Sequence, residues 1–537
     1  MTSHAKPWTM HYRGVPENIE SPTGSLIDLL DDAVAGAGDR PALTFDGRET
    51  SYAELGRQVA SVAEGLRRLG VGVGDRVALL LPDCPQHVVA FFAVLRLGAI
   101  VVDHDPRSTK RDLRAMFHDH GARVAIAWDK SVAKISGRGF ALDTIVAVTL
   151  LDELSRRTRM SLSLPFPTSR SRRAELTAST EGTVAWASLR SNPPLAHDHP
   201  RPAADDPAMI SYTARFKGAM LSHLNLHASA RQAASWLGQS GPTIYALVPS
   251  HAFVTVMVVG MAMEGNLVLF YSADADAVLD AAASRAPTVM WTVPPMFAAL
   301  AERRRGVDLT VSISISPVPV RDDIASMWES LTGGVLIETY GMAECSHLAL
   351  GHPCHLSHRT GTAGIPLPST QMRVEPRAAG HGELLLRGPQ VFSGYWGDEE
   401  ETRKALSADG WLHTGDLVTV DEDGFVTVID PIGDLIATAG MTVVPSEVES
   451  VLITHPSIAA AAVIGFDRGA GPDIIGAVVI AKGVTLDTED VRSLCRQHLP
   501  EHAVPRRIVP VLELPTLPSG VVDRKQVRAE IEPYLTQ

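Results

Sequence analysis

The stretch MISYTARFKGAMLSHLNL, residues 209–226, places a basic turn between an apolar segment and a helical run. The apolar segment ends at Thr213, and the helical run opens at Ser222-His223. Proteins bind phosphate where a strand, a turn and a helix start meet, because a helix N-terminus exposes free N–H donors and the positive end of its dipole. The spacing therefore predicts a phosphate-binding loop with Lys217 as its cation.

The turn itself, Ala214-Arg215-Phe216-Lys217, lacks the residues that such a loop uses. A backbone that wraps phosphate needs glycine or small hydroxyl residues, and none stands between Thr213 and Lys217. Losing the cradle removes several charge-assisted hydrogen bonds, each worth roughly 1.5–3 kcal/mol. Arg215 can replace some of the charge but not the enclosing geometry.

A second group of reactive residue types follows Glu344 in the segment ECSHLALGHPCHLSHR. Its spacing matches no standard structural zinc pattern, although cysteine and histidine are zinc ligands. A histidine acting as a general base, or Cys345 acting as a nucleophile, is a second interpretation. A loop with incidental histidines is the third, and the sequence leaves all three open. The residues are Cys345, His347, His352, Cys354, His355 and His358.

Length and composition restrict the class of protein. A chain of 537 residues is too long for one core, so two or more domains are expected. The formal net charge of -13 disfavours nucleic acid and anionic membranes as partners. The four scattered cysteines favour a reducing cytoplasm. Residues 1–20 contain no apolar signal peptide, and the apolar run 252–263 is too short to span a bilayer.

Helix-like and strand-like segments alternate along most of the chain, which predicts a layered α/β fold with buried strands. Residues 52–69 have apolar side chains at helical spacing, and residues 76–81 have the pattern of a core strand. Gly70, Gly72 and Gly74 follow a helix instead of opening one, so they indicate a helix end and not a dinucleotide fingerprint. The segment 155–207, rich in Arg, Ser, Thr and Pro, is expected to be an exposed excursion.

A compact α+β unit is predicted near the C-terminus, after the segment 430–434. Its expected strands are 459–464 and 477–481, and its expected helices are 445–454 and 488–498. The segment 430–434 has a proline and a glycine flanked by acids, which is typical of a hinge. The sequence therefore predicts two domains, 1–430 and 431–537.

Five motifs in order carry a resemblance to a known family. They are KGAMLSHLNL (217–226), ETYGMAE (338–344), GELLLRGPQVFSGYW (382–396), DGWLHTGDL (409–417) and VPSEVE (444–449). Together they resemble the adenylate-forming superfamily of acyl-CoA synthetases, luciferases and peptide-synthetase adenylation domains, over nearly the whole chain. Residues 103–130 further resemble bacterial long-chain fatty acid–CoA ligases. The resemblance implies a large N-terminal layered α/β domain and a small, mobile C-terminal α+β lid.

The resemblance also implies chemistry. Family members use ATP and magnesium to convert a carboxylate into an acyl adenylate, and then pass the acyl group to a thiol, commonly that of coenzyme A or a carrier protein. Thr213 opens the expected phosphate loop, and Lys217, Tyr340, Glu344 and Asp416 match positions that stack adenine, hold magnesium and bind ribose, with Glu344 as the metal ligand. Asp416 could instead cap a turn. His251 matches a histidine near the acyl pocket, although it could equally be a core residue.

Several residues depart from the family pattern. The phosphate loop is shortened, Ala343 replaces a threonine that contacts the α-phosphate, and Pro431 replaces an arginine that contacts ribose. Val521 stands where the family has its catalytic lysine, and Lys525 lies four positions further on. The segment SISISPVPV replaces a glycine-rich strand beside adenine. These losses leave little to stabilise charge in a phosphoryl transition state.

The sequence thus predicts an acyl-CoA synthetase-like protein that has lost efficient adenylation and binds or processes an acyl or acyl-thioester ligand, in specialised metabolism. ATP or AMP with magnesium is expected to bind weakly or not at all. Apolar segments 245–258 and 289–300 are expected to keep the acyl pocket. One alternative is a working ligase with an atypical phosphate loop that activates an acyl group, an unusual acid or nitrite. The other is a non-catalytic regulatory pseudoenzyme.

Overall fold

The structure is a computed structural model that falls into two compact units. It describes residues 6–213, 215–248, 250–272, 274–304, 306–307, 309–356, 359, 361–377, 381–438, 441–467, 472–517 and 521–535. The first unit comprises Met1–Thr360, Gly364–Gln371 and Arg387–Leu412, and the second comprises Gly361–Ala363, Met372–Leu386 and His413–Gln537. The division into 1–430 and 431–537 stays a prediction.

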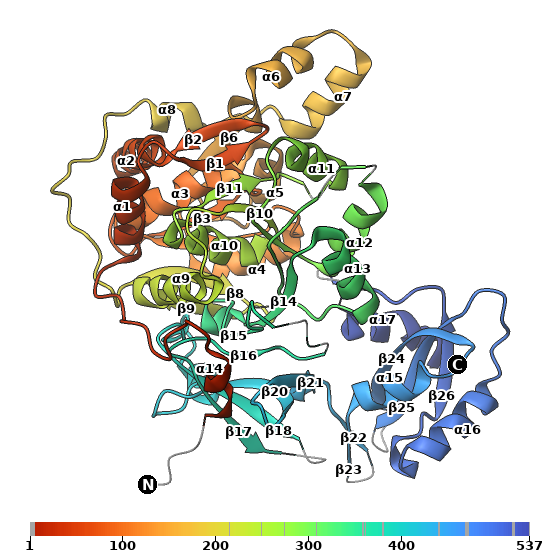
Figure 1. Ribbon diagram of the computed structural model, residues 1–537. Helices are drawn as coiled ribbons and strands as arrows, with labels where there is room; N and C mark the ends of the chain where they lie inside the picture. The colour runs from red at the N-terminus through yellow and green to blue at the C-terminus, as the bar shows by residue number, and fades with distance from the viewer. Residues whose placement is uncertain are drawn as a thin grey trace. The chain divides into compact units, whose positions relative to one another are not determined.

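The first unit is built on two large sheets (Figure 1). The nine-stranded sheet has the order β16-β15-β14-β13-β12-β10-β11-β1-β2, and its strands from β14 to β1 pair in parallel. It comprises β1 (Pro41–Phe45), β2 (Arg48–Ser51), β10 (Thr243–Leu247), β11 (Asn266–Leu269), β12 (Val289–Thr292), β13 (Ile313–Ser316), β14 (Val335–Tyr340), β15 (Leu350–Gly351) and β16 (Ile365–Pro366).

The eight-stranded sheet has the order β19-β9-β8-β4-β3-β5-β6-β7. Strands β8, β4, β3, β5, β6 and β7 pair in parallel, as expected for buried strands linked by helices. The strands are β3 (Arg76–Leu80), β4 (Ile100–Asp103), β5 (Val124–Trp128), β6 (Thr144–Val148), β7 (Val184–Ala185), β8 (Pro207–Tyr212), β9 (Gly218–Ser222) and β19 (Gly394–Tyr395). Strand β3 confirms the core strand predicted at 76–81.

Helices cover these sheets, and their ends follow the local sequence. Helix α2 (Tyr52–Arg68) confirms the predicted helix at 52–69, and the Ser51 side chain caps it by accepting a hydrogen bond from the Glu54 N–H. The others are α1 (Leu26–Ala37), α3 (Pro85–Arg96), α4 (Lys110–His120), α5 (Val132–Ile135), α8 (Trp186–Arg190), α9 (His223–Leu237), α10 (Ser250–Ala262), α11 (Ala275–Ser284), α12 (Pro294–Arg303), α13 (Asp322–Thr332) and α14 (Glu399–Ala405). No helix in the described part of the chain is long and apolar enough to cross a membrane.

The excursion predicted at 155–207 is exposed, but it also contains helices. Helices α6 (Arg156–Ser163) and α7 (Pro167–Leu176) stand out from the rest of the first unit in Figure 1. The Ser155 side chain caps α6, and Pro167 stands in the first turn of α7. These helix-start residues favour helices here although the composition of the segment is typical of a loop.

The phosphate-loop geometry expected from strand, turn and helix is wrong. Strand β8 turns directly into β9, and the two strands pair antiparallel with Tyr212 opposite Gly218. Helix α9 begins at His223, as predicted, but only after β9. A capping box between Ser222 and Asn225 already uses N–H groups at the start of α9. The turn at 213–217 therefore joins two strands and does not open a helix.

The second unit holds a four-stranded sheet, a two-stranded ribbon and a three-stranded sheet. The predicted strands and helices after 445 are confirmed; the first strand is longer at both ends, and the second begins five residues earlier and ends one residue earlier than predicted. Side chains of Val448, Leu452, Val463, Val478 and Val491 share one core. The elements are β17 (Gln371–Pro376), β18 (Gly382–Arg387), β20 (Leu412–Val420), β21 (Val426–Pro431), β22 (Ile436–Thr438), β23 (Met441–Val443), α15 (Pro445–Leu452), β24 (Ile458–Asp467), β25 (Pro472–Ile480), α16 (Thr488–His498), β26 (Arg507–Val511) and α17 (Arg524–Leu535).

Candidate functional site

The turn between β8 and β9 uses its own backbone donors internally. The N–H groups of Arg215 and Lys217 donate to Thr213 Oγ1 at 3.3 and 3.2 Å, and the N–H of Phe216 donates to the Thr213 carbonyl at 2.9 Å. Phe216 has a φ of 58°, in the left-handed region that favours glycine. All three of these N–H groups therefore donate to Thr213 within the turn.

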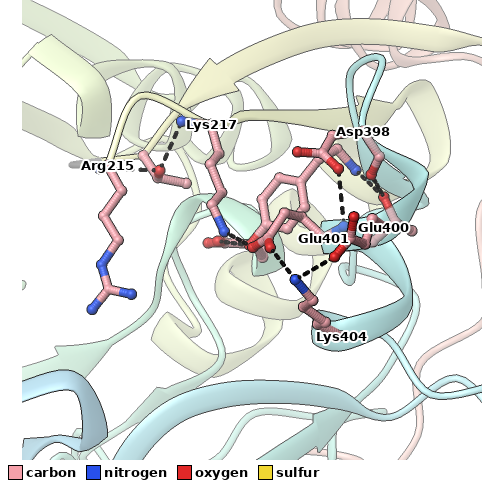
Figure 2. A network of polar contacts seen from close by, with 10 residues as sticks. Arg215, Lys217, Asp398, Glu400, Glu401 and Lys404 are labelled. Carbon is pink, nitrogen blue, oxygen red and sulfur yellow. Dashed lines mark hydrogen bonds and ion pairs between the residues drawn. The ribbon is translucent and has the colours of Figure 1, made fainter.

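The side chain of Lys217 is also engaged. Its Nζ forms an ion pair with the carboxylate of Glu401 in α14 and lies 5.3 Å from the centre of the Tyr395 ring (Figure 2). Lys404 donates to the other oxygen of Glu401 at 2.8 Å. Hydrogen bonds from Lys217 and then Lys404 lower the pKa of Glu401 to about 2, so this carboxylate is charged at neutral pH. Arg215 is exposed and points away from this group in Figure 2.

Tyr395 connects Lys217 to the predicted magnesium ligand. The Tyr395 hydroxyl donates to Glu344 Oε1 at 2.6 Å, and the N–H of Phe392 donates to the Glu344 carbonyl at 2.8 Å. Burial, and then the negative charge of Glu344, raises the pKa of Tyr395. Tyr395 thus links Lys217 to Glu344, and the Lys217 N–H links this group to Thr213 Oγ1.

Tyr340 ends β14, four residues before Glu344, and the chain then folds back closely on itself. A Cβ on Gly341 would lie 2.2 Å from the carbonyl carbon of His347, so no larger residue fits there. Ser346 and His347 follow with φ values of 55° and 61°. The close approach and the two left-handed residues shape the tight loop that carries Glu344.

The cysteines and histidines after Glu344 point to different neighbours. Cys345 is buried, and its Sγ accepts from the Met342 N–H at 3.3 Å. His347 Nε2 lies 3.0 Å from Ser211 Oγ, and Cys354 Sγ lies 3.7 Å from the Trp236 carbonyl. His358 lies outside the described residues. The zinc interpretation gains no support from these contacts.

One group of three metal-ligand side chains does lie close together in the part that the structure describes. Ligand atoms of Glu375, Glu383 and His413, in the second unit, lie within 4.8 Å of one another. Arg377 forms ion pairs with both carboxylates and supplies the compensating charge without a metal ion. Sequence reasoning did not single out these residues.

The predicted acyl-pocket segments pack in one core. Tyr245, Phe297 and Leu300 belong to a single hydrophobic cluster of the first unit. Tyr245 also borders a cavity of about 480 Å³, with Phe45, Val268 and Ala281 among its walls. His251 lies in the first turn of α10, but its side chain is outside the described part.

Asp416 belongs to the second unit, in β20. Its N–H donates to Thr414 Oγ1 at 3.1 Å, and it pairs across the sheet with Pro431. The proline that replaces the hinge arginine is therefore the last residue of strand β21. Asp416 and Tyr340 belong to different units, so each is described within its own unit.

An arginine that sequence reasoning missed holds the hinge segment. Arg524 forms ion pairs with Asp430 at 2.9 Å, Asp434 at 3.3 Å and Glu449 at 2.9 Å. Lys525 borders a cavity of about 400 Å³ beside Arg524, whereas Val521 is exposed. Both acids that flank the predicted hinge thus bind the same guanidinium group.

Comparison with known proteins identifies the family. A model of the AMP-binding enzyme family matches residues 30–396, and a model of the AMP-binding enzyme C-terminal domain matches residues 447–520. The chain belongs to the AMP-binding enzyme family. This confirms the resemblance to the adenylate-forming superfamily and the predicted α/β fold class with a large N-terminal and a smaller C-terminal domain.

Relatives of this AMP-binding enzyme family member span almost the full chain. The long-chain-fatty-acid–CoA ligase of Salmonella typhimurium is 30% identical over 94% of this chain and 94% of its own length. The feruloyl-CoA synthase of an Amycolatopsis species is 32% identical over 91% of this chain and 95% of its own length. The ATP-bound structure of MatB from Rhodopseudomonas palustris is 25% identical, with a TM-score of 0.78 over 96% of this chain and 100% of that one.

Two residues of this family member's site escaped sequence reasoning. Tyr395 lies in the GYW motif, which marks the family but does not reveal that its hydroxyl reaches Glu344. Glu401 lies in an acidic run at the start of α14, where acids also favour the helix dipole. No local signal distinguishes the acid that pairs with Lys217 from its neighbours.

Proposed function

We propose that this protein binds an acyl or acyl-thioester ligand and forms acyl adenylates poorly or not at all. The observation that supports this most is the turn at 213–217, whose described N–H groups all donate within the turn. The Lys217 ammonium is committed to Glu401. In the described residues of the turn, the backbone N–H groups and the Lys217 ammonium thus already have partners within the protein.

Electrostatics gives the expected size of the loss. Charge-assisted hydrogen bonds contribute roughly 1.5–3 kcal/mol each, and donors placed in advance stabilise a charged transition state most. Replacing a lysine by Val521 and an arginine by Pro431 removes two further cations. The lost hydrogen bonds and the two lost cations together lead us to expect weak binding of ATP or AMP with magnesium.

The remaining site residues keep their proposed roles. Glu344 is the candidate magnesium ligand, and Thr213, Tyr340 and Asp416 are the candidate nucleotide contacts. Lys217 and His251 are the candidate catalytic residues. Coenzyme A or a carrier protein is the candidate thiol partner, and the cytoplasm is the expected location.

The cavity of about 480 Å³ beside Tyr245 is the candidate place for the acyl chain. Phe45, Val268 and Leu269 give it apolar walls. Its charged lining comprises Arg172, Arg285, Asp46, Glu49, Asp274 and Asp280, and Arg285 forms an ion pair with Glu49. Burying a chain gains roughly 0.8 kcal/mol for each methylene, so useful affinity needs no nucleotide.

A working ligase with an atypical phosphate site is the second candidate. The names of the relatives favour it, because they are a long-chain-fatty-acid–CoA ligase and a feruloyl-CoA synthase. In that case the turn would have to rearrange, and Glu401 would have to release Lys217, before ATP binds.

Calorimetry with MgATP and pyrophosphate exchange with a panel of fatty and aromatic acids separate the two. The first candidate predicts binding weaker than tens of micromolar, on the order of −6 kcal/mol or less favourable, and little exchange. Low-micromolar binding together with robust exchange would establish the second candidate instead.

A further inference from the structure

Ser211 and His347 form a hydrogen-bonded pair that the family's adenylation chemistry does not use. Ser211 lies near the end of β8, and its Oγ is 3.0 Å from Nε2 of His347. The serine is 2% exposed. A serine hydroxyl and an imidazole nitrogen at this distance are the first two members of a nucleophile–base arrangement.

The histidine is held in place from several sides. His347 and the preceding Ser346 both have left-handed backbone conformations, which cost energy and persist only where the surroundings impose them. The close approach of Gly341 leaves no room for the loop to relax. Thr255 Oγ1 donates to the Ser346 carbonyl at 3.1 Å, and Ser346 Oγ donates to the Gln390 carbonyl at 2.9 Å.

Ser211 also borders a cavity of about 170 Å³. Met209 and Tyr212 of β8 and Thr213 just after it border the same cavity. The volume equals that of about six water molecules in the liquid, which is enough for a short acyl group. Asp103, on the neighbouring parallel strand β4, borders the same cavity and forms an ion pair with His87.

Cys345 is the weaker candidate for a nucleophile in this region. Its Sγ is buried and engaged with the N–H and carbonyl groups of Met342. Of the histidines in this segment, His347 has a serine hydroxyl, that of Ser211, within hydrogen-bond distance.

We infer that Ser211 is an acylable nucleophile activated by His347, acting on short acyl thioesters without ATP. The Ser211 hydroxyl proton moves to His347 Nε2 as Oγ bonds to the carbonyl carbon, and the carbon–sulfur bond breaks. The imidazolium then protonates the departing thiolate. In the second half, water attacks the serine ester, its proton passes through His347 to Ser211 Oγ, and the free acid leaves. This inference takes from the proposed function only its substrate class, an activated acyl group.

The test incubates the full-length protein with butyryl-CoA, without nucleotide, and measures the intact mass and the modified peptide. The expected result is one butyryl group on Ser211 in the wild type and none in Ser211→Ala. His347→Asn should slow acylation about 100-fold or more, because general-base assistance is lost while asparagine tolerates the left-handed backbone. Hydrolysis of 4-nitrophenyl butyrate should fall in parallel.

Ser457→Ala is the matched control, since Ser457 is a buried serine beside a histidine in the second unit and its N–H, not its hydroxyl, contacts His455 Nδ1. It should acylate at the wild-type rate. Thermal unfolding of each variant separates loss of chemistry from loss of fold. A wild type that forms no adduct, or an adduct that persists in Ser211→Ala, would overturn the inference and leave the pair as a tether between β8 and the loop. Because no ATP is present, failure of the adenylation proposal would leave this result unchanged.

Discussion

Lys217 and Glu401 form an ion pair between segments that are 184 residues apart in the sequence. Both side chains are about two-thirds withdrawn from solvent, with side-chain exposures of 32% and 28%. Glu401 carries a full negative charge, because hydrogen bonds from Lys217 and Lys404 lower its pKa to about 2. The Glu401 carboxylate therefore binds the Lys217 ammonium, as Figure 2 shows, and we expect it to compete with a phosphate for this cation.

Removing this carboxylate charge should strengthen nucleotide binding. Glu401→Gln leaves the shape of the side chain but frees Lys217, so MgATP should bind about three- to fivefold more tightly, as expected for a partly exposed ion pair. Calorimetry measures the change. Glu400→Gln is the matched control, because Glu400 pairs with Lys404 and not with Lys217. Equal affinities for wild type and Glu401→Gln would show that the ion pair does not compete with ATP.

Restoring one lysine should not restore catalysis. Val521→Lys returns a cation at the family position, but the turn at 213–217 still uses its N–H groups internally. Pyrophosphate exchange should therefore stay near background in this variant. Strong exchange in the single mutant would mean that the turn matters less than its hydrogen bonds suggest.

Much of this fold could be predicted from the sequence, because apolar spacing and helix caps are local signals and the family motifs occur in a recognisable order. Apolar spacing located α2, and Ser222 marked the start of α9. Strand β9 was missed because five residues beside a turn reveal nothing of their pairing with β8. The partners of Lys217 and of His347 lie on distant segments, and only the folded chain brings them together.

Acid should destabilise the first unit through two buried histidines. His104 and His120 lie 3.2 Å apart at their Nε2 atoms, and burial lowers their pKa values from 6.5 to about 3 and about 2. Because the unfolded chain binds protons more readily, the stabilisation is present above pH 6.5 and is lost as the pH falls below it. From pH 6.5 to 5.5 the loss should be on the order of 1 kcal/mol for each histidine.

Thermal unfolding between pH 7.5 and 5.5 measures this dependence. His104→Phe should reduce the pH dependence by about half, since a phenyl ring can keep the stacking with Phe117 and Tyr212 without binding a proton, while His120 still titrates in the unfolded chain. His118→Gln, on the exposed side of the same helix as His120, should leave the slope unchanged. If the dependence of stability on pH is the same in His104→Phe as in the wild type, His104 does not contribute to the acid sensitivity.

Arg524 should be essential to the stability of the second unit. Arg524→Met leaves Asp430, which is 2% exposed, without its cation, and breaking such a buried pair costs about 3–5 kcal/mol. Limited proteolysis and chemical denaturation of the full chain should both show early loss of the second unit. Arg528→Met, one turn along the exposed face of α17, should behave like wild type. A stable Arg524→Met protein would mean that Asp430 finds another partner or is protonated.

The acyl ligand should bind without nucleotide in the cavity beside Tyr245. Fatty acids and acyl-CoAs of graded length should bind more tightly as the chain lengthens, by up to about 0.8 kcal/mol per methylene until the cavity is full.

Gly260 is unsuitable for blocking the cavity, because a Cβ there would already lie 2.7 Å from Leu267. Ala281→Trp fills the cavity from α11, whereas Ala283→Trp on the exposed face of the same helix does not. Fluorescence competition with a labelled fatty acid should lose its signal in the first variant and keep it in the second. If affinity does not depend on chain length, or if Ala281→Trp binds as tightly as the wild type, the acyl group binds elsewhere. The apolar residues around this cavity would then be only part of the hydrophobic core.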